Sequence, residues 1–489
     1  MTALLDPAPR SAGPLVSARS EDAWVPDLSR FRGPRYKAIA DALAADIEQN
    51  RLPSGTRLPT HRDLAYRLKV TVGTVTRAYS EAEKRGLIGG EVGRGTFVRP
   101  RLEAVPPQAL GNSDTLIDLA INVSANNSGG EAEALRETLA EIGLQGGVEP
   151  FLAYQPHLGM ADHRAAMARF IARPGFEPEP ETVFLTSGAQ HALLMALSAV
   201  AAPGDTIACD ALTYGGLKSA ARLMHLRIKG LPSDEEGILP DAFDAACREG
   251  LVKALYCMPT LQNPTAIIWS AQRRAEIAAL AQRHRVAVLE DDVYGFLVPE
   301  APLPMRSYAP DQVYYLNSTS KSLAAGLRIG ALVAPTEAAA RIATGVRTTV
   351  WMAPPLMAEI VKRWVNDGTA QRLVAEKRSE GAARQAIARR ALADYGLSPR
   401  ACHPNAYHMW LNLPEGWRDD VLIPAARREG VILSPTSAFC VGRTVSDGIR
   451  LALGTPRCRA DVEKGFHALG RLLGRDRQAA DLAEEESVI

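Results

Sequence analysis

Cysteine is scarce in this 489-residue chain, and the spread of its few copies excludes two kinds of protein. The six cysteines, at positions 209, 247, 257, 402, 440 and 458, never form a Cys-x-x-Cys pair. Structural zinc sites and disulfide-stapled domains both need cysteines at short, regular spacings. The sequence therefore predicts no metal site and no disulfide framework, and it fits a reducing compartment, the cytoplasm.

Long hydrophobic runs are also missing. No apolar stretch approaches the ~20 residues that a membrane-spanning helix requires. The first thirty residues contain proline and serine but no continuous apolar segment, which disfavours a secretory signal, and we expect a loose leader over 1–30. The hydrophobic content of 46% and charged content of 23% are those of a globular protein without a membrane segment, long enough for two or three domains.

The chain carries almost no net charge, +1, but its charges are unevenly distributed. Between Arg30 and Pro100 fourteen Lys and Arg stand against seven Asp and Glu, and this local surplus of seven leaves the other 418 residues at −6. A basic N-terminal module on a near-neutral body suits binding to a nucleic-acid backbone. A merely solvated surface would explain the surplus as well, so charge alone leaves both interpretations open.

Residues 31–100 have the pattern of three short helices followed by a hairpin. Apolar side chains on one face predict the first helix over 36–50. Thr60, with an acid three residues on, forms a capping box that opens a second helix ending near Leu68. A third helix should end at Gly86, and the apolar segments 87–88 and 96–98 should form a wing around a glycine-rich turn. The buried face predicted for the third helix is Val72, Val75, Tyr79 and Ala82.

The exposed side chains of this arrangement predict a DNA-reading surface. The second helix of a helix-turn-helix enters the major groove, and wing arginines contact phosphate or the minor groove. The runs 57–65 and 93–96 resemble the GntR-type winged helix, which implies a double-stranded DNA operator as partner. A helix-turn-helix used for protein contacts is the alternative. The predicted DNA-contacting residues are Arg62, Thr74, Thr76, Arg77 and Arg94.

From residue 116 onward, short strand-like runs alternate with helices, which predicts an α/β body on a largely parallel sheet. Proline and glycine over 101–115 predict a linker. We assign 116–368 to a large domain, 369–475 to a smaller α+β domain and 476–489 to an acidic tail. The expected strands are 182–186, 206–209, 254–256, 286–289, 313–317 and 329–334, with helices such as 190–200 and 271–284 between them.

Three motifs follow predicted strands of this body. A single lysine, Lys321, stands in the Ser- and Gly-containing run 318–328. The run 187–190 opens a helix, where backbone N–H groups and the helix dipole favour a phosphate. An acidic cluster fills 290–292; it could bind a metal instead, but no His or Cys adjoins it.

Together, residues 150 to 460 resemble the fold-type I aminotransferases, which use pyridoxal 5′-phosphate (PLP). The resemblance implies that Lys321 carries PLP as a Schiff base and that Asp291, rather than Asp292, pairs with the pyridine nitrogen. It implies that Tyr214 stacks on the ring and that Asn263 and Tyr294 bind the phenolic oxygen. The residues that would hold the phosphate are Ser187, Gly188, Ala189, Gln190, Ser318, Ser320 and Arg328.

The resemblance also implies partners. Tyr154 would reach the phosphate of a neighbouring subunit, so a head-to-tail homodimer is expected. Arg450 would bind the carboxylate of an amine or amino-acid effector, unless it serves a structural ion pair. Two departures affect the pocket walls: Ala266 replaces the usual glycine after Asn-Pro-Thr, and no proline precedes Tyr214.

The whole arrangement of winged helix, linker and aminotransferase-like body, over residues 34 to 470, is similar to the MocR subfamily of GntR-type transcriptional regulators. It implies a PLP-dependent DNA-binding regulator that senses PLP or an amine-bearing small molecule, with a residual half-reaction left open. Two other interpretations remain: an active aminotransferase with a vestigial winged helix, and a DNA-binding scaffold whose pocket is empty. The effector, the operator and the sign of regulation do not follow from the sequence.

Overall fold

The chain divides into two compact units, Met1–Glu103 and Ala104–Ile489. The computed structural model describes residues 24–28, 31, 33–48, 51–52, 56–85, 87–91, 95–98, 116–125, 129–442 and 448–474. The predicted linker, the acidic tail, Gly86, the wing-tip Arg94 and most of the leader lie outside these residues. No helix in the described ranges is long and apolar enough to cross a membrane.

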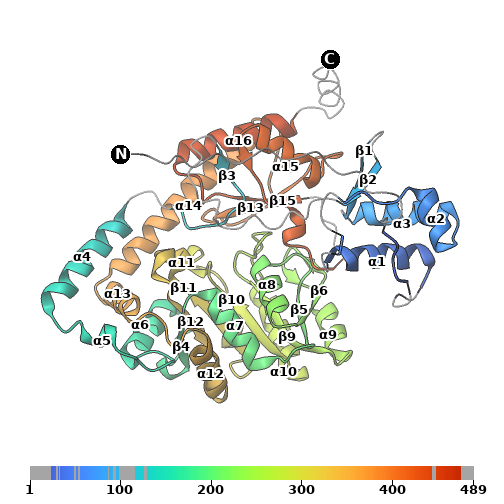
Figure 1. Ribbon diagram of the computed structural model, residues 1–489. Coiled ribbons are helices and arrows are strands. Elements are labelled where there is room, and N and C mark those ends of the chain that lie inside the picture. The colour runs from blue at the N-terminus through green and yellow to red at the C-terminus, as the bar shows by residue number, and fades with distance from the viewer. Residues whose placement is uncertain are drawn as a thin grey trace, which may run out of the picture. The chain divides into compact units, whose positions relative to one another are not determined.

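The N-terminal unit is a winged helix-turn-helix (Figure 1). Thr60 caps the second helix, and its hydroxyl accepts a hydrogen bond from the N–H of Asp63 at 3.2 Å, as the capping box predicted. Ile39, Leu43 and Leu64 are among the buried side chains that join the helices into one core. The elements are α1 (Arg35–Glu48), α2 (His61–Leu68), α3 (Val72–Lys84) and the antiparallel strands β1 (Ile88–Glu91) and β2 (Gly95–Val98).

One predicted core position of α3 is wrong. Val72 is 45% exposed, whereas Val75, Tyr79 and Ala82 are buried as expected. Val72 directly follows the N-cap residue Thr71, and helical side chains lean toward the helix N-terminus. Its side chain therefore extends past the end of the helix instead of into the core.

The C-terminal unit contains a seven-stranded sheet in the order β4-β12-β11-β10-β9-β5-β6. Neighbouring strands run parallel except around β12, which is antiparallel to both β4 and β11. The edge strand β6 was not predicted, because Arg227 and Lys229 interrupt its apolar pattern. The strands are β4 (Val183–Thr186), β5 (Thr206–Asp210), β6 (Arg227–Leu231), β9 (Val252–Cys257), β10 (Ala287–Asp291), β11 (Val313–Ser318) and β12 (Gly330–Val333).

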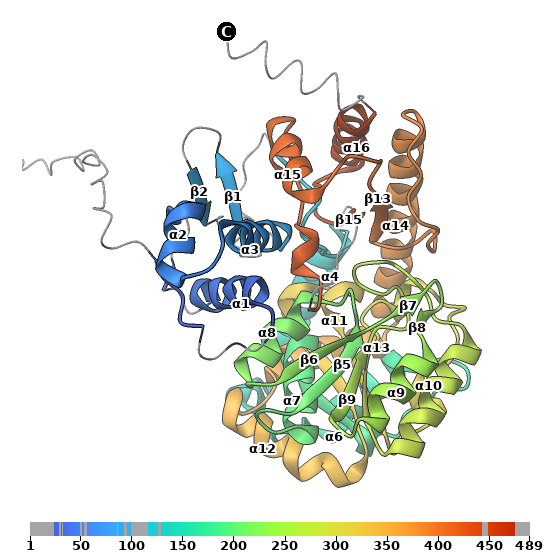
Figure 2. The same ribbon diagram turned by 90° about the vertical axis from the view of Figure 1, so that its right-hand side faces the viewer.

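Helices cover both faces of this sheet (Figure 2). Side chains of α7 (Ala189–Val200), α8 (Gly215–Leu223) and α12 (Ala339–Thr349) share a core with one set of alternate strand residues. The opposite set packs against α9 (Pro240–Arg248) and α10 (Ala271–His284), and against α6 (Ala161–Ile171) and α13 (Pro355–Asn366). Further elements of this domain are α4 (Gly130–Gln145), α5 (Glu149–Leu152), α11 (Thr319–Ser322), β7 (Ser233–Asp234) and β8 (Gly237–Ile238).

The C-terminal part forms a smaller α+β layer. Its strands β13 (His408–Asn412) and β15 (Gly448–Ala452) pair antiparallel, and β14 (Val431–Ile432) pairs in parallel with β3 (Ile117–Asp118). The segment 117–118, which the sequence analysis assigned to the large domain, is thus built into the small one. Pairing across more than 300 residues leaves no local pattern. The helices are α14 (Thr369–Ala393), α15 (Asp419–Arg428) and α16 (Arg459–Leu473).

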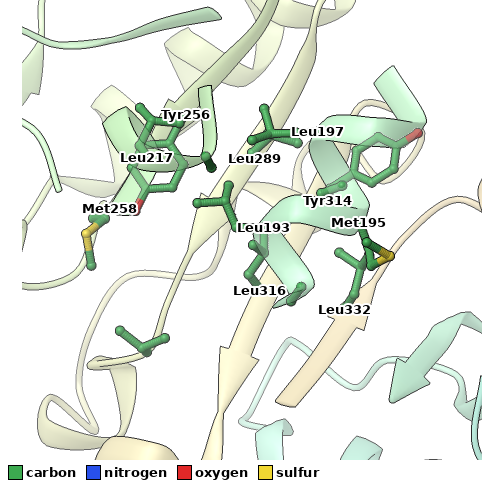
Figure 3. Packing of buried hydrophobic residues seen from close by; sticks show 14 of the residues in the cluster. Leu193, Met195, Leu197, Leu217, Tyr256, Met258, Leu289, Tyr314, Leu316 and Leu332 are labelled. Carbon is green, nitrogen blue, oxygen red and sulfur yellow. The ribbon is translucent and has the colours of Figure 1, made fainter. Parts of the chain in front are cut away.

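The largest hydrophobic cluster among the described residues lies beneath α7, the helix that follows the predicted phosphate-binding turn at Ser187 and Gly188. Leu193 and Leu197 of α7 belong to the same buried cluster as Leu289, Leu316 and Leu332 of the sheet (Figure 3). Leu193 is 1% exposed. We expect Leu193→Ala to lower the free energy of unfolding by about 3 kcal/mol, because the lost side chain leaves a cavity.

Denaturant unfolding followed by tryptophan fluorescence measures this difference. Leu223→Ala is the matched control, since Leu223 is 70% exposed and its truncation should cost less than about 0.5 kcal/mol. Equal unfolding midpoints for the two variants would contradict the assignment of Leu193 to the core.

Candidate functional site

The candidate residues of the C-terminal unit gather where parallel strands end. Ser187 follows β4, Asp291 is the last residue of β10, and Lys321 lies in α11 directly after β11. β10 and β11 are neighbours, with Asp291 opposite Leu316. Because the carboxyl ends of parallel strands meet at one edge of a sheet, three distant segments supply one site.

Arg328 and the loop after β4 form a small cationic cradle. The Arg328 guanidinium donates through Nη2 to the carbonyl oxygen of Ser187 at 2.9 Å and through Nη1 to Oγ of Ser320 at 3.3 Å. Gly188 has φ +89°, and a Cβ there would lie 2.5 Å from Nη2 of Arg328. Only glycine leaves room for the guanidinium, and Gly188 also precedes the N-terminus of α7. Ser318 lines the same turn, and its Oγ accepts from the N–H of Ser320 at 3.1 Å.

Tyr214 is brought beside this cradle by α8, whose N-cap it forms. A Cβ on Gly216 would lie 2.2 Å from the Tyr214 ring, and Gln190 donates to the Gly216 carbonyl oxygen at 3.1 Å. Burial, and then the negative charge of Asp291, raise the pKa of Tyr214. The ring therefore lies within the electrostatic reach of Asp291.

The adjacent carboxylates Asp291 and Asp292 face different surroundings. Asp291 accepts a hydrogen bond from Tyr256 at 2.9 Å, and burial raises its pKa to about 6 while Lys321 is among the groups that lower it. Asp292 instead accepts from Tyr315 at 2.7 Å and Arg173 at 3.4 Å. Of the two, only Asp291 acts on the pKa of Lys321.

Lys321 is the half-buried lysine of the site. Its Nζ donates to the main-chain oxygen of Asn122. Burial, followed by repulsion from Arg450, lowers the pKa of Lys321 to about 8, while Asp291 opposes the change. A larger fraction of this amine than of an exposed lysine is therefore unprotonated and nucleophilic near neutral pH.

Asn263 and Tyr294 also reach the site. Oδ1 of Asn263 accepts from Nη1 of Arg450 at 2.9 Å. The Tyr294 hydroxyl lies 2.9 Å from Nδ2 of Asn122, which in turn lies 3.0 Å from Nδ1 of His408. Both predicted residues thus lie in a connected network of polar groups around Lys321.

Arg450 is held in place by hydrogen bonds, and no carboxylate in the described part of the chain forms an ion pair with it. Its Nη2 donates to the carbonyl oxygen of Ala120, and its guanidinium carbon lies 4.6 Å from the centroid of the Phe439 ring. Nε is buried and has no hydrogen-bond partner among the described residues. Burial lowers the pKa of Arg450 to about 10. The alternative of a structural ion pair finds no support in this part of the chain, and the side chain suits a carboxylate ligand.

Tyr154 is the one candidate that the fold does not bring to this pocket. It is 81% exposed, and its ring centroid lies 5.4 Å from that of Trp351. The sequence analysis missed Asn122, Tyr256, His191 and His408. His191 accepts from the N–H of Ser187 at 3.0 Å and so supports the phosphate loop. None of the four belongs to a motif that spacing along the chain could identify.

The donor set fits a phosphorylated, aldehyde-bearing pyridine. Lys321 supplies an amine, Asp291 a carboxylate for a cationic ring nitrogen, and Tyr214 an aromatic face. Arg328 and the Gly188 loop supply positive charge and room where a Cβ would intrude. These four features match the four functional parts of PLP.

Another group of ligand-type side chains lies elsewhere in the unit. Donor atoms of Asp162, His163 and Glu359 approach within 4.8 Å of one another. Lys362 already occupies this cluster, with Nζ 2.9 Å from Asp162 and 2.5 Å from Glu359. An ammonium group there neutralises the carboxylates, and the cluster is an ion-pair network.

The N-terminal unit presents a separate polar surface on α2 and α3. Arg77, Thr76 and Arg62 are exposed and Thr74 is half-buried, whereas Arg94 lies outside the described residues. The hydroxyl of Thr76 donates to the Val72 carbonyl at 3.0 Å and lies 3.2 Å from Nδ1 of His61. Arg77 is an exposed cationic donor on this helix.

A hollow of about 350 Å³ opens at the start of α3. Arg35 of α1 faces it together with Arg77, so two cations line one depression. The sequence analysis counted Arg35 in the basic surplus but did not assign it. Arg85, by contrast, pairs with Asp41 at 2.6 Å and Glu81 at 2.9 Å. The remaining residues around the hollow are Tyr36, Thr71, Gly73 and Thr74.

Comparison with known proteins accounts for both surfaces. The family of bacterial regulatory proteins of the GntR type matches residues 35–98, and the class I and II aminotransferase family matches residues 114–462. LysN, the α-aminoadipate aminotransferase of Thermus thermophilus, complexed with N-(5′-phosphopyridoxyl)-L-leucine, gives a TM-score of 0.65 at 26% identity over 81% of this chain and 98% of its own. The pocket is therefore that of a PLP-binding domain.

Proteins named as transcriptional regulators match more than the winged helix alone. The HTH-type transcriptional regulator YdeF of Bacillus subtilis is 29% identical over 464 residues, 92% of this chain and 97% of its own. The HTH-type pyridoxine biosynthesis transcriptional regulator PdxR of Corynebacterium glutamicum is 27% identical over 63% of this chain and 67% of its own. The chain thus belongs to the MocR subfamily of GntR-type regulators, in which a winged helix precedes a class I and II aminotransferase domain.

Proposed function

We propose that this protein is a transcriptional regulator that binds an operator through its winged helix and senses PLP, or an amine that reacts with PLP, through its aminotransferase-like pocket. One observation carries the proposal. The same chain has an exposed arginine, Arg77, on the second helix of the helix-turn-helix and a lysine, Lys321, whose pKa is lowered by burial. The first suits a phosphate backbone and the second suits an aldehyde cofactor.

Different residues of the pocket would hold different parts of the cofactor. Lys321 would hold it covalently, Asp291 would pair with the pyridine nitrogen, and Tyr214 would lie against the ring. Arg328, together with the loop residues around Gly188, would bind the phosphate. Bound PLP supplies an electron-withdrawing ring that stabilises negative charge beside the attached nitrogen.

Lys321 performs the step that sets the state of the pocket. The amine must lose its proton before it can attack a carbonyl carbon. Burial and Arg450 both disfavour its charged form, and the carbonyl oxygen of Asn122 accepts a hydrogen bond from Nζ and orients it. An effector amine bound to the cofactor in place of Lys321 would leave the lysine amine free to accept a proton.

The effector we propose carries a carboxylate as well as an amine. Arg450 is buried, has no acidic partner among the described residues, and keeps Nε unpaired. A carboxylate would complete its hydrogen bonds at little desolvation cost, because the guanidinium is already out of water. The name of PdxR, which refers to pyridoxine biosynthesis, makes PLP itself the second candidate signal.

We further propose that the protein acts as a head-to-tail homodimer. Large apolar side chains of α4, α5 and the turn after α12 are exposed, among them Leu144 at 88%, Leu152 at 86% and Trp351 at 45%. The Tyr154 ring contacts that of Trp351. Exposed large apolar side chains favour coverage by a partner, and a second copy would carry Tyr154 to its neighbour's phosphate site.

Binding of DNA upstream of the protein's own and neighbouring genes, with and without PLP, tests the proposal. We expect specific binding whose affinity changes with PLP. Lys321→Ala should bind the same DNA, lack absorbance near the visible edge, and fail to respond to PLP, because it cannot hold the cofactor covalently. Lys229→Ala, which removes a surface lysine paired with Glu249, is the matched control and should behave as the parent.

Two outcomes would overturn this function. Specific binding in neither state, together with steady amino-group transfer between an amino acid and a keto acid, would make the protein an aminotransferase with a vestigial winged helix. A PLP response that persists in Lys321→Ala would place the cofactor on another residue.

Arg77→Ala should weaken operator binding by roughly tenfold, the size of one lost base or phosphate contact, and leave PLP loading unchanged. Titration of labelled operator at fixed salt measures the effect. Arg51→Ala removes the same charge from the same unit outside α3 and controls for long-range electrostatics. If both variants bind with equal affinity, Arg77 makes no specific contact.

Loading of PLP onto the apoprotein should accelerate as pH rises through about 8, the lowered pKa of Lys321. Arg450 repels the charged amine, so Arg450→Gln should raise that pKa and move the midpoint of the rate profile upward by about 1 pH unit. Stopped-flow absorbance measures the rate. Arg372→Gln, a surface change on α14, should leave the midpoint in place, and an unmoved midpoint in Arg450→Gln would remove Arg450 from the site.

A further inference from the structure

Asn122 forms hydrogen bonds with both Lys321 and Tyr294 in the pocket. Its main-chain oxygen accepts a hydrogen bond from Lys321, and its side-chain Nδ2 lies 2.9 Å from the hydroxyl of Tyr294. The same Nδ2 lies 3.0 Å from Nδ1 of His408, and Nε2 of His408 lies 2.9 Å from the carbonyl oxygen of Gln262. The four residues Asn122, Gln262, Tyr294 and His408 are all buried. They form one unbranched chain of hydrogen bonds that ends at Tyr294.

The direction of each bond in this chain follows from its far end. A carbonyl oxygen only accepts, so Nε2 of His408 carries the hydrogen toward Gln262. Burial lowers the pKa of His408 to about 3, and the ring is therefore neutral. A neutral imidazole with hydrogen on Nε2 offers Nδ1 as an acceptor. Asn122 must then turn its amide nitrogen, and not its oxygen, toward the ring.

The orientation of Asn122 decides the role of Tyr294. The amide nitrogen has two hydrogens, one for Nδ1 of His408 and one for the Tyr294 oxygen. Because the Tyr294 oxygen accepts here, its own hydrogen remains free for another acceptor. With the amide reversed, the tyrosine would donate to Asn122 and offer no hydrogen to a ligand.

The chain keeps this direction although one atom stays unpaired. Oδ1 of Asn122 is buried and has no hydrogen-bond partner among the described residues. An unpaired buried acceptor is unfavourable, and a protein selected for stability alone would supply a hydrogen-bond donor to this oxygen. The unpaired oxygen is therefore a second indication that the two bonds of Nδ2 serve the pocket.

The chain also joins the two domains of the C-terminal unit. His408 is the first residue of β13 in the small domain, whereas Gln262 and Tyr294 follow β9 and β10 of the large sheet. We propose that His408 and Asn122 are positioning residues that make Tyr294 a hydrogen-bond donor to the phenolic oxygen of PLP. The proton affinity of the lysine–cofactor linkage then depends on where the small domain holds β13. This inference rests on PLP being held by Lys321.

Other titratable groups face the same place and stay unchanged in the test. Arg450 of β15, Tyr214, Asp291 of β10 and Tyr407 act on Tyr294, and Arg450 and Asp291 act on Lys321. Any shift caused by a change at His408 is therefore measured against a constant field from these groups.

The experiment is a pH titration of the visible absorbance of the PLP-loaded full chain. His408→Leu removes the acceptor that orients Asn122, so Tyr294 loses its direction. A donor to the phenolic oxygen stabilises the anion that remains when the linkage is unprotonated. Its loss should therefore raise the apparent pKa of the linkage by about 0.5 to 1 unit, the size of one ordinary hydrogen bond. His408→Gln should restore the parent value, because its amide can accept through Oε1 and donate through Nε2.

A double-mutant comparison separates positioning from loosened packing. Tyr294→Phe should raise the pKa by itself, and adding His408→Leu to it should produce no further shift. His163→Leu, at a buried histidine paired with Glu359 away from this chain of bonds, should leave the pKa unchanged. Asn122→Ala, which removes the donor directly, should reproduce the shift and replaces His408→Leu if that variant does not fold.

An unchanged pKa in His408→Leu or Asn122→Ala overturns the inference, as does an equal added shift in the Tyr294→Phe background. Absence of visible absorbance in the parent protein is a different result. It would overturn the assignment of Lys321 as the cofactor lysine and with it the proposed function.

Discussion

The removal of the Lys321 amine from water is the constraint on which the C-terminal unit depends. An ammonium group is stabilised by water or by an anion, and here burial removes the water, so the pKa of Lys321 is lowered although Asp291 opposes the change. That environment requires the ends of parallel strands on one side of the amine and the small domain on the other side. The fold provides both, because β10 and β11 end at the same edge while Asn122 and Arg450 approach from the other layer.

Arginine serves the two units in opposite ways. Arg77 and Arg62 are exposed on the winged helix, where salt and water moderate their charge and binding to DNA releases counterions. Arg450 of the pocket, by contrast, is buried at 6% exposure and donates hydrogen bonds to Oδ1 of Asn263 and to the carbonyl oxygen of Ala120. An exposed arginine suits a long polyanion of variable sequence, whereas a buried one suits a single small anion of defined shape.

The pocket combines groups that an enzyme would use with a connection that a sensor needs. Its amine, carboxylate and phosphate cradle match the chemistry of PLP, yet Tyr294 is oriented from the small domain through His408. A ligand that shifted one domain against the other would therefore also change the hydrogen bond that Tyr294 offers to a bound cofactor. Ala266 adds a departure of its own, since it keeps φ +59° while buried, a backbone conformation in which glycine is unstrained.

The sequence alone determined the winged helix, the α/β body, and the lysine, acid and phosphate-loop motifs at strand ends. Each of these features produces a pattern among residues that are close in sequence. The patterns are a capping residue three positions before its partner, strands that alternate with helices, and a lysine just after a strand. Tertiary structure decided the rest. Pairing of β3 with β14, exposure of Val72, and the contact of Asn122 with His408, 286 residues apart, leave no local pattern. They arise only when packing brings distant segments together, because hydrogen-bond direction and burial depend on neighbours in space.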